Sequence, residues 1–290
     1  MQWDILAQAI VNGILIGGVY SLASVGLNLI FGVVKIVNFA HGEFIMLGMY
    51  ITYWSWALFG IDPLLSLVIT MPLMFLFGVV VQRFLFQPIL KAPELAQIFM
   101  TIGLQILLQN LALAIFSANY RSIPTAYGAI AYHLGPIVIS APRLFAFIIS
   151  VVLSAALGFL LLGTDLGKAM RAAAQDREVA ELMGINQNYI FLIAVGLAAA
   201  LAGAAGTVVM PFFYAYPTAG IAFGLKSFVV AIAGGLGSVR GAFLMGLILG
   251  AAESLGVQYV GADAGMLVAF IILLVVLVIR PQGLFSGGRL

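Results

Sequence analysis

Long apolar stretches follow one another along almost the whole chain, and they constrain the fold more than any other feature of the sequence. A helix needs about 20 apolar residues to cross the hydrocarbon core of a bilayer. Nine stretches come near that length, at residues 5–30, 44–60, 63–84, 94–117, 143–163, 189–210, 219–236, 241–257 and 264–280. With 64% apolar and 8% charged residues, the composition is also far from that of a soluble domain. The sequence therefore predicts an integral membrane protein.

We expect an all-α, polytopic helical bundle of about 8 to 10 transmembrane segments, with residues 1–290 forming one transmembrane domain. The seventh stretch is rich in glycine and contains Lys226, so it is also consistent with a broken or re-entrant helix. The N-terminus has no basic segment before its first apolar stretch, which favours a retained span over a cleaved signal peptide.

Several classes of function are disfavoured by the composition. The chain has no cysteine and only two histidines, His41 and His133, so we expect neither thiol chemistry nor a metal site. A net charge of +2 is too small to indicate nucleic acid binding. No nucleophile with a base and an orienting group can be assembled from the polar residues, so we do not expect an enzyme.

Basic residues predict the orientation, because Lys and Arg are retained in cytoplasmic loops. If all nine stretches cross, Arg121 and Arg143 lie outside, and nine basic residues lie inside. The nine are Lys35, Arg83, Lys91, Lys168, Arg171, Arg177, Arg240, Arg280 and Arg289. The sequence thus predicts an external N-terminus, a cytoplasmic C-terminus and an irregular external loop at 118–142, where a substrate or a binding protein could arrive.

One polar segment stands out between the fifth and sixth stretches. Of the 12 basic and 10 acidic residues, seven lie between Asp165 and Glu181. Apolar residues recur there at helical spacing, and Gly167 and Gly184 lie near the two ends. We call residues 164–188 the polar loop and predict a short amphipathic helix, or a pair of helices, that docks onto a partner outside the membrane. Its small alanine face would allow close approach. A solvated loop without a partner is the alternative.

Polar residues within or beside the apolar stretches are candidates for contacts with a substrate or its pathway. Asn38, His41 and Glu43 interrupt the pattern between the first two stretches, and buried polar groups in membranes need partners. Gln105 and Gln109 are four positions apart and therefore share one helix face. A structural role is the alternative for Asn38, His41 and Glu43, and we expect the face with Gln105 and Gln109 to turn inward.

Lys226 and Glu253 lie inside apolar stretches, where a charge costs about 2.5 to 3.5 kcal/mol on insertion scales. They should face a cavity, each other or the interface, and snorkelling toward the interface is the plain alternative. Between these residues, four glycines in the eight positions 234–241 predict a tight cytoplasmic turn. The turn lacks the Gly-Lys-Ser or Gly-Lys-Thr of a phosphate-binding loop.

Four segments together resemble a known family. They are Ile36-Val-Asn-Phe-Ala-His-Gly-Glu-Phe-Ile-Met-Leu-Gly48, the polar loop with Gly167-Lys-Ala-Met-Arg-Ala-Ala-Ala-Gln-Asp176 and Gly184-Ile-Asn186, the turn Gly234-Gly-Leu-Gly-Ser238, and the ending Arg280-Pro-Gln-Gly-Leu-Phe285. They are similar to the H-type permease subunit of bacterial branched-chain amino acid ABC transporters, in the hydrophobic amino acid uptake family. The resemblance covers essentially the whole chain.

The resemblance implies a multi-pass permease of the bacterial inner membrane, with no cofactor on this chain. The implied partners are a second permease subunit, of M-type or homologous, a periplasmic substrate-binding protein and two cytoplasmic ATPase subunits that bind ATP and Mg. The polar loop matches the family's cytoplasmic coupling loop. The residues implied in coupling are Gly167, Arg171, Ala173, Ala174, Asp176, Glu181 and Gly184.

This chain departs from the general pattern of ABC permeases, because Arg171-Ala-Ala-Ala174 stands where Glu-Ala-Ala is usual. The departure leaves the contacts with the ATPase open. A permease for urea or short amides in the same family is an alternative. An ATP-independent secondary transporter or channel would need ionisable residues deep in the spans and no docking helix, and a membrane scaffold would not need the polar breaks.

Overall fold

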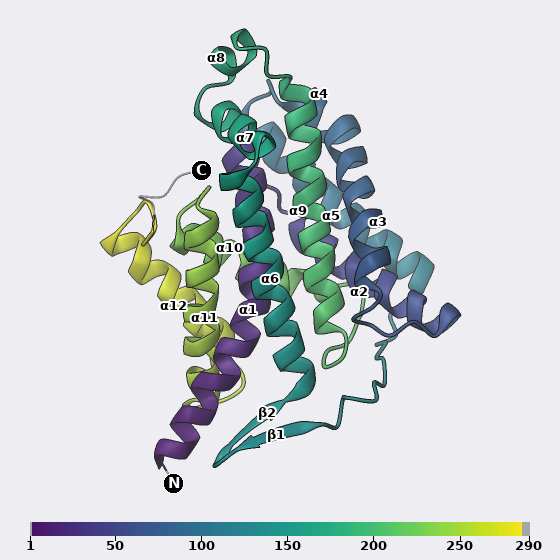
Figure 1. Cartoon of the computed structure of the whole chain (residues 1–290), viewed down its shortest axis with the longest axis vertical. Helices are drawn as coiled ribbons and strands as arrows, with labels where there is room; N and C mark the ends of the chain where they lie inside the picture. Colours follow the sequence, from purple (N-terminus) through teal and green to yellow (C-terminus); the bar gives the residue numbers. More distant parts are fainter. Residues whose placement is uncertain (1, 286–290) are drawn as a thin grey trace.

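The computed structural model describes residues 2–285, and most of its helices run along one long axis (Figure 1). Arg289, predicted to be cytoplasmic, lies outside the described residues. The helices are α1 (Gln2–Val34), α2 (His41–Phe59), α3 (Leu67–Val81), a π-helical segment (Gln82–Phe86), α4 (Gln87–Ile89), α5 (Glu94–Phe116), α6 (Ala141–Gly163), α7 (Asp165–Gln175), α8 (Arg177–Leu182), α9 (Gln187–Val209), α10 (Ala219–Gly234), α11 (Val239–Tyr259) and α12 (Ala264–Ile279).

Each of the nine apolar stretches corresponds to one of these helices. Within the described residues, six helices are long and apolar enough to cross a membrane: α1, α5, α6, α9, α11 and α3 with its continuation to Ile89. The others are shorter, with 19 residues in α2 and 16 each in α10 and α12. The predicted helical membrane bundle is confirmed, whereas the number of crossings stays a prediction.

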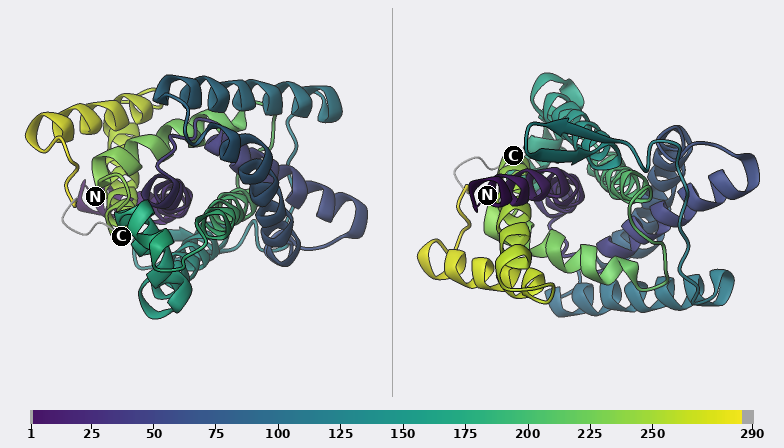
Figure 2. Two further views of the ribbon diagram at one scale, coloured as in Figure 1. Left: turned by 90° about the horizontal axis from the view of Figure 1, so that it is seen from above. Right: turned by 90° about the horizontal axis from the view of Figure 1, so that it is seen from below.

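The core of the bundle is formed around α1 and α9, which are the most buried of the six long helices. Helix α1 packs against α6, α9, α10 and α11, and α9 packs against α2 and α3. Glycines allow this close approach: a Cβ on Gly206 of α9 would lie 2.2 Å from the carbonyl oxygen of Ile45 in α2. In contrast, α5 and α12 lie along one edge of the bundle (Figure 2).

The two ends of the bundle differ. Helices α7 and α8 lie at one end, and a β-hairpin and the start of α1 lie at the other (Figure 1). The hairpin pairs β1 (Ala131–Leu134) with β2 (Ile137–Ser140) in antiparallel register. The loop predicted to be irregular at 118–142 therefore contains a short hairpin that the sequence pattern did not predict. A two-residue turn with Gly135 at φ +62°, followed by β-branched residues, favours a hairpin.

The side chain of Gln8 fixes the hairpin to the start of α1. Its amide nitrogen donates to the carbonyl of Val138 at 2.8 Å, and its oxygen accepts from the Val138 backbone N–H at 2.7 Å. Both hydrogen bonds join residues that are 130 positions apart in the chain. The hairpin is thus part of the tertiary structure of that end.

Candidate functional site

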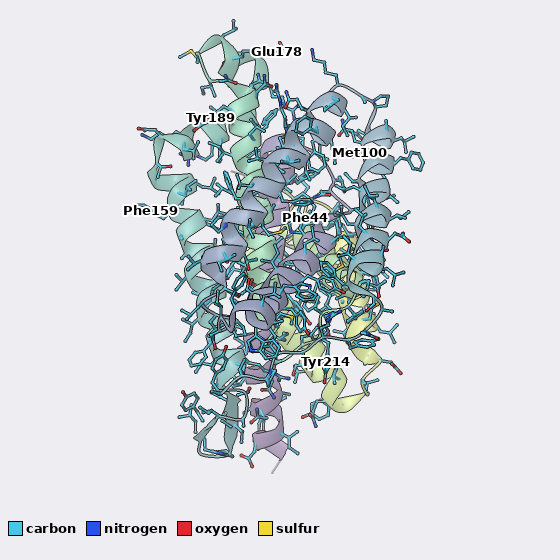
Figure 3. The ribbon with its side chains drawn as sticks, turned by 90° about the vertical axis from the view of Figure 1, so that its right-hand side faces the viewer. Phe44, Met100, Phe159, Glu178, Tyr189 and Tyr214 are labelled. Carbon is cyan, nitrogen blue, oxygen red and sulfur yellow. The ribbon has the colours of Figure 1, made fainter. Side chains whose placement is uncertain are left out.

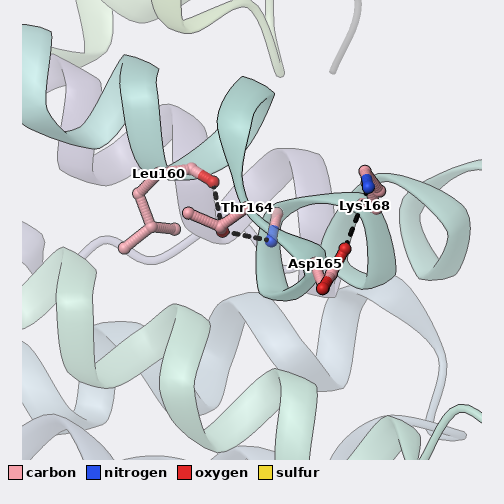
Figure 4. Close-up of polar contacts among 5 residues, drawn as sticks. Leu160, Thr164, Asp165 and Lys168 are labelled. Carbon is pink, nitrogen blue, oxygen red and sulfur yellow. Dashed lines mark hydrogen bonds and ion pairs between the residues drawn. The ribbon is translucent and has the colours of Figure 1, made fainter.

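The polar loop begins with a tight junction between α6 and α7. Thr164 Oγ1 accepts a hydrogen bond from the Gly167 backbone N–H at 3.1 Å and donates to the carbonyl of Leu160 at 2.6 Å (Figure 4). A Cβ on Gly167 would lie 2.2 Å from that same carbonyl oxygen, so only glycine fits at this position. Lys168 pairs with Asp165 at 2.9 Å on the exposed side of α7 (Figure 4). The junction holds α7 directly against the end of α6.

Helix α8 has a defined beginning and end. Asp176 Oδ1 accepts from the backbone N–H of Val179 at 3.1 Å, which caps its start. At its end, Gly184 has φ +84° and donates to the carbonyl of Glu181, and Ile185 N–H donates to the carbonyl of Ala180. These two hydrogen bonds form a Schellman motif. The predicted pair of helices is confirmed, and Asp176 and Gly184 set the limits of the second one.

The two helices present different faces. Helix α7 buries Gly167, Met170 and Ala173 against the chain's own spans, so the expectation of an alanine face open to a partner is wrong for Ala173. The reason is that Ala173 shares one helix face with Met170, whose burial on the core stabilises the loop. Arg171 and Ala174 are partly exposed.

Helix α8 instead exposes apolar side chains at the outermost end of the molecule. The exposed fractions are 54% for Val179, 86% for Leu182 and 78% for Met183, and we call these three residues the α8 patch. Figure 3 shows Glu178 of the same helix at that extreme end. Glu181 is exposed beside the patch.

Arg177 ties the start of α8 to the membrane helices. Its guanidinium donates to the carbonyl of Val34, the last residue of α1, at 2.5 Å and lies 5.1 Å from the ring centroid of Phe191 in α9. Gln187, the first residue of α9, donates to the carbonyl of Arg177 and to the carboxylate of Glu181. Arg177 was predicted to be one of the cytoplasmic basic residues, and the sequence pattern did not indicate this anchoring role.

A cavity of about 930 Å³ lies at the same end, among segments that are far apart in the sequence. It is lined by the end of α1, the start of α5, the end of α7, the end of α10, the glycine turn and the chain after α12. The lining residues include Lys35, Glu94, Gln97, Gln175, Gly237 and Gln282. All four segments that carried the family resemblance therefore meet around one cavity.

Asn28 holds the glycine turn beside that cavity. Its Nδ2 donates to the carbonyls of Gly235 and Ser238 at 3.3 and 3.1 Å, and its Oδ1 accepts from the N–H of Gly237 at 3.2 Å. The backbone N–H of Leu284 donates to the carbonyl of Ala233 and brings the chain after α12 to the same place. Asn28 lies inside the first apolar stretch, where the sequence pattern alone does not indicate this role.

The break between α1 and α2 buries its three polar side chains completely. Asn38 Oδ1 accepts from the backbone N–H of Ala40 at 3.1 Å, and His41 Nε2 is 2.8 Å from the carbonyl of Ala23. Glu43 Oε1 accepts from Gln109 Nε2 at 2.8 Å, which joins α2 to α5. The structure therefore brings together Glu43 and Gln109, and Gln105 lies one turn earlier on the same face of α5.

Each of the three buried side chains also keeps a polar atom without a hydrogen-bond partner in the described part of the chain. These atoms are Nδ2 of Asn38, Nδ1 of His41 and Oε2 of Glu43. Gly220 of α10 leaves room for the Glu43 carboxylate, because a Cβ there would lie 2.6 Å from Oε2. The large cavity at the α7–α8 end is lined by none of the five candidate pathway residues.

Lys226 and Glu253 face each other, which was one of the three expectations for them. Lys226 Nζ lies 2.5 Å from Glu253 Oε1 and 2.8 Å from the hydroxyl of Tyr20. The pair joins α10 to α11 and α1. The plain alternative, that each side chain snorkels alone to the interface, is wrong for this arrangement.

Comparisons with known proteins agree on one family. Residues 9–277 match the profile described as branched-chain amino acid transport system / permease component. The high-affinity branched-chain amino acid transport system permease protein BraD of Pseudomonas aeruginosa is 32% identical, over 96% of this chain and 95% of that protein. The corresponding protein LivH of Escherichia coli K12 is 29% identical, over 98% of this chain and 97% of its own length.

The fold is also found among solved structures. A chain in the structure titled PsaBC from Streptococcus pneumoniae in complex with Fab has a TM-score of 0.50 with 13% sequence identity. The match covers 98% of this chain and 93% of that chain. It supports the arrangement of the helices.

Proposed function

The chain belongs to the branched-chain amino acid transport system permease family, and from this premise we propose that it is the membrane-spanning permease subunit of an ATP-driven importer of branched-chain amino acids. The family match over nearly the whole chain and the bundle of apolar helices support this function. ATP and Mg would be bound by two separate cytoplasmic ATPase subunits. The remaining partners would be a second permease subunit and a periplasmic substrate-binding protein, in a bacterial inner membrane with the α7–α8 end on the cytoplasmic side.

The observation that carries the coupling proposal is the α8 patch. Two large apolar side chains of the six-residue helix α8, and that of the residue after it, are exposed on a segment that hydrogen bonds fix at both ends. Exposed apolar clusters rimmed by charges are typical of protein interaction sites. We propose that the ATPase docks on Val179, Leu182 and Met183, with Arg171, Asp176 and Glu181 providing the polar rim.

The other predicted coupling residues would act by holding α7 and α8 in place. Gly167 and Ala173 seat α7 against the spans, Ala174 lines the cavity beside it, and Gly184 ends α8. A rigid helix pair held in this way can convert closure of an ATPase dimer into movement of α6 and α9. No chemistry on this chain is needed.

Substrate contacts are proposed for Asn38, His41, Glu43, Gln105 and Gln109. A buried polar group without a partner costs about 1 to 3 kcal/mol, so the three unpartnered atoms of the break are poised to gain a hydrogen bond in another state. The test is Glu43→Gln, which keeps the shape of the side chain and removes the charge of its carboxylate. If its role is in transport, leucine uptake should fall while folding and ATPase association stay normal. A parallel loss of thermal stability would instead favour a structural role.

Coupling is tested with Leu182→Asp, which places a charge in the α8 patch without disturbing the core. The matched control is Val260→Asp, because Val260 is 79% exposed and lies just after α11 at the other end. The permease would be purified with its ATPase and binding-protein partners and assayed for complex formation and for ATP-dependent uptake of leucine and urea into vesicles. We expect Leu182→Asp alone to release the ATPase.

Each outcome separates one part of the proposal. Leucine uptake by the wild type that needs ATP supports the importer, whereas uptake of urea alone would keep the mechanism and change the substrate. Uptake that does not depend on ATP would contradict the ATP-driven function. Equal ATPase binding by both aspartate variants would show that the α8 patch is not the docking surface.

A further inference from the structure

A narrow apolar groove of about 360 Å³ runs between α6 and α11. Both helices pack on α1, which lies between them in Figure 1, and they touch each other little. Its walls are Val151, Ser154, Ala155 and Gly158 on α6, and Val239, Arg240, Phe243 and Leu244 on α11. Exposed apolar residues such as Val152 and Phe159 flank the groove, so its surroundings match a lipid-facing surface. Small residues on α6 leave this space open.

Arg240 is the only charged residue that lines the groove. It is the second residue of α11, directly after the glycine turn, and its side chain is exposed at that end of the span. Within residues 2–285 it forms no ion pair and no side-chain hydrogen bond. A guanidinium near the end of a span matches a phosphate group in charge and in hydrogen-bond geometry.

Ser154 is a second polar residue in the lining of the groove. It is 7% exposed, and its hydroxyl has no hydrogen-bond partner among the described residues. Ser21, Ser55 and Ser227 each donate to the carbonyl four residues earlier, whereas Ser150, one turn before Ser154 on α6, also has no partner among the described residues. The Ser154 hydroxyl is thus a buried donor without a partner, on a residue that lines an apolar groove.

We propose that this groove is a binding site for an anionic phospholipid of the bilayer. One acyl chain would lie between α6 and α11, an ester oxygen would accept from Ser154, and the phosphate would pair with Arg240. Basic pockets between membrane helices on the cytoplasmic side bind anionic headgroups in this way. A hydrophobic helix of a partner protein is a poorer match, because it would cover Arg240 without compensating its charge.

The test is lipid retention by the full-length protein, purified in its native complex and titrated with phosphatidylglycerol or phosphatidylcholine. Native mass spectrometry would count bound lipids. We expect a preference for phosphatidylglycerol that falls about tenfold in Arg240→Gln, equal to about 1.4 kcal/mol. Arg83→Gln is the charge control, since Arg83 is exposed in the π-helical segment and outside the groove.

The groove itself is tested by filling it. Ala155→Leu places a branched side chain into the groove, whereas Ala156→Leu adds the same side chain at the next position, which is exposed and outside the lining. We expect Ala155→Leu to weaken retention of both lipids and Ala156→Leu to leave it unchanged. Gly158→Leu is a second filling variant, because a Cβ on Gly158 meets no atom within 4 Å.

Three results would overturn the proposal. They are an unchanged lipid preference in Arg240→Gln, equal retention by the two leucine variants, and no retained lipid in the wild type. A protein occupant would be recognised by cross-linking from Leu244→Cys, a unique thiol because the natural chain has no cysteine. Cross-linking to a partner subunit would contradict the lipid assignment.

Discussion

Replacing Glu253 by glutamine tests whether the charge pair between α10 and α11 stabilises the bundle. Lys226 and Glu253 side chains are only 17% and 14% exposed, and Nζ lies 2.5 Å from Oε1. In Glu253→Gln, the ammonium would lose its charged partner and keep only neutral ones: the new amide oxygen, the hydroxyl of Tyr20 and the face of the Tyr20 ring, whose centroid is 4.8 Å away. Breaking a buried pair by removing one partner costs about 3 to 5 kcal/mol.

Because both side chains keep some exposure, we expect Glu253→Gln to lower the free energy of unfolding by about 3 kcal/mol, near the lower end of that range. Lys226→Met should cost a similar amount, since it leaves the carboxylate unpaired. The double variant Lys226→Met/Glu253→Gln has no buried charge and should recover most of the loss, because replacing a whole buried pair is often close to neutral. The two changes should therefore be strongly non-additive.

The assay is a double-mutant cycle on the free energy of unfolding, measured by chemical denaturation of the protein in one fixed detergent. An interaction energy of about 2 kcal/mol or more would support a desolvated pair. Single variants that each cost less than about 1 kcal/mol, or costs that simply add, would refute the reasoning. In that case both side chains reach water at the interface and the pair contributes little.

Four further predictions concern glycines and polar anchors. Gly184→Ala forces a side chain into a left-handed conformation at φ +84°, so the stability of α8 should fall by about 1 to 2 kcal/mol. Under the proposed function, ATPase association should weaken as well, as measured by titration with the ATPase subunit. Gly206→Ala should prevent stable folding, because its Cβ would lie 2.2 Å from the Ile45 carbonyl oxygen, whereas Gly103→Ala on the open face of α5 should raise the thermal midpoint or leave it unchanged. Asn28→Leu removes three buried hydrogen bonds of the glycine turn. It should lower the free energy of unfolding, measured by chemical denaturation, by about 3 kcal/mol or more. Under the proposed function, Arg177→Met should keep the ATPase bound but reduce ATP-dependent leucine uptake, and normal uptake would contradict a role in coupling.

Much of the fold could be predicted because a bilayer allows few solutions for an apolar chain. Every spanning segment must satisfy its own backbone, so length and hydropathy located all nine apolar helices. The hairpin at Ala131–Ser140 was missed, since its strands are four residues each and its prolines and glycines favoured a loop. The exact ends of the helices could not be predicted from the hydropathy pattern either, because capping at Asp176 and Gly184 depends on local backbone geometry.

The partners of the polar residues were harder to predict than the helices that carry them. Spacing placed Gln105 and Gln109 on one face of α5, but contact of Gln109 with Glu43 depends on how α2 and α5 pack. Likewise, Lys226 and Glu253 are 27 positions apart and meet only because α10 and α11 lie antiparallel beside α1. Periodicity gives the direction of a side chain from its own helix and carries no information about the neighbouring one.

The anchoring of Arg177 suggests how the polar loop and the candidate pathway residues are linked. Its guanidinium binds the carbonyl of Val34, and the next residue, Lys35, has φ +59° and begins the break that carries His41 and Glu43. A left-handed residue at the end of a helix fixes the direction of the following chain, so a displacement of α8 would be passed through Val34 to that break. Because His41 and Glu43 each keep a buried atom without a partner in the described structure, a small shift there would change their hydrogen bonding at low cost. Under the proposed function, this covalent and hydrogen-bonded route, about ten residues long from Val34 to Glu43, would connect ATPase docking on α8 with the candidate pathway residues.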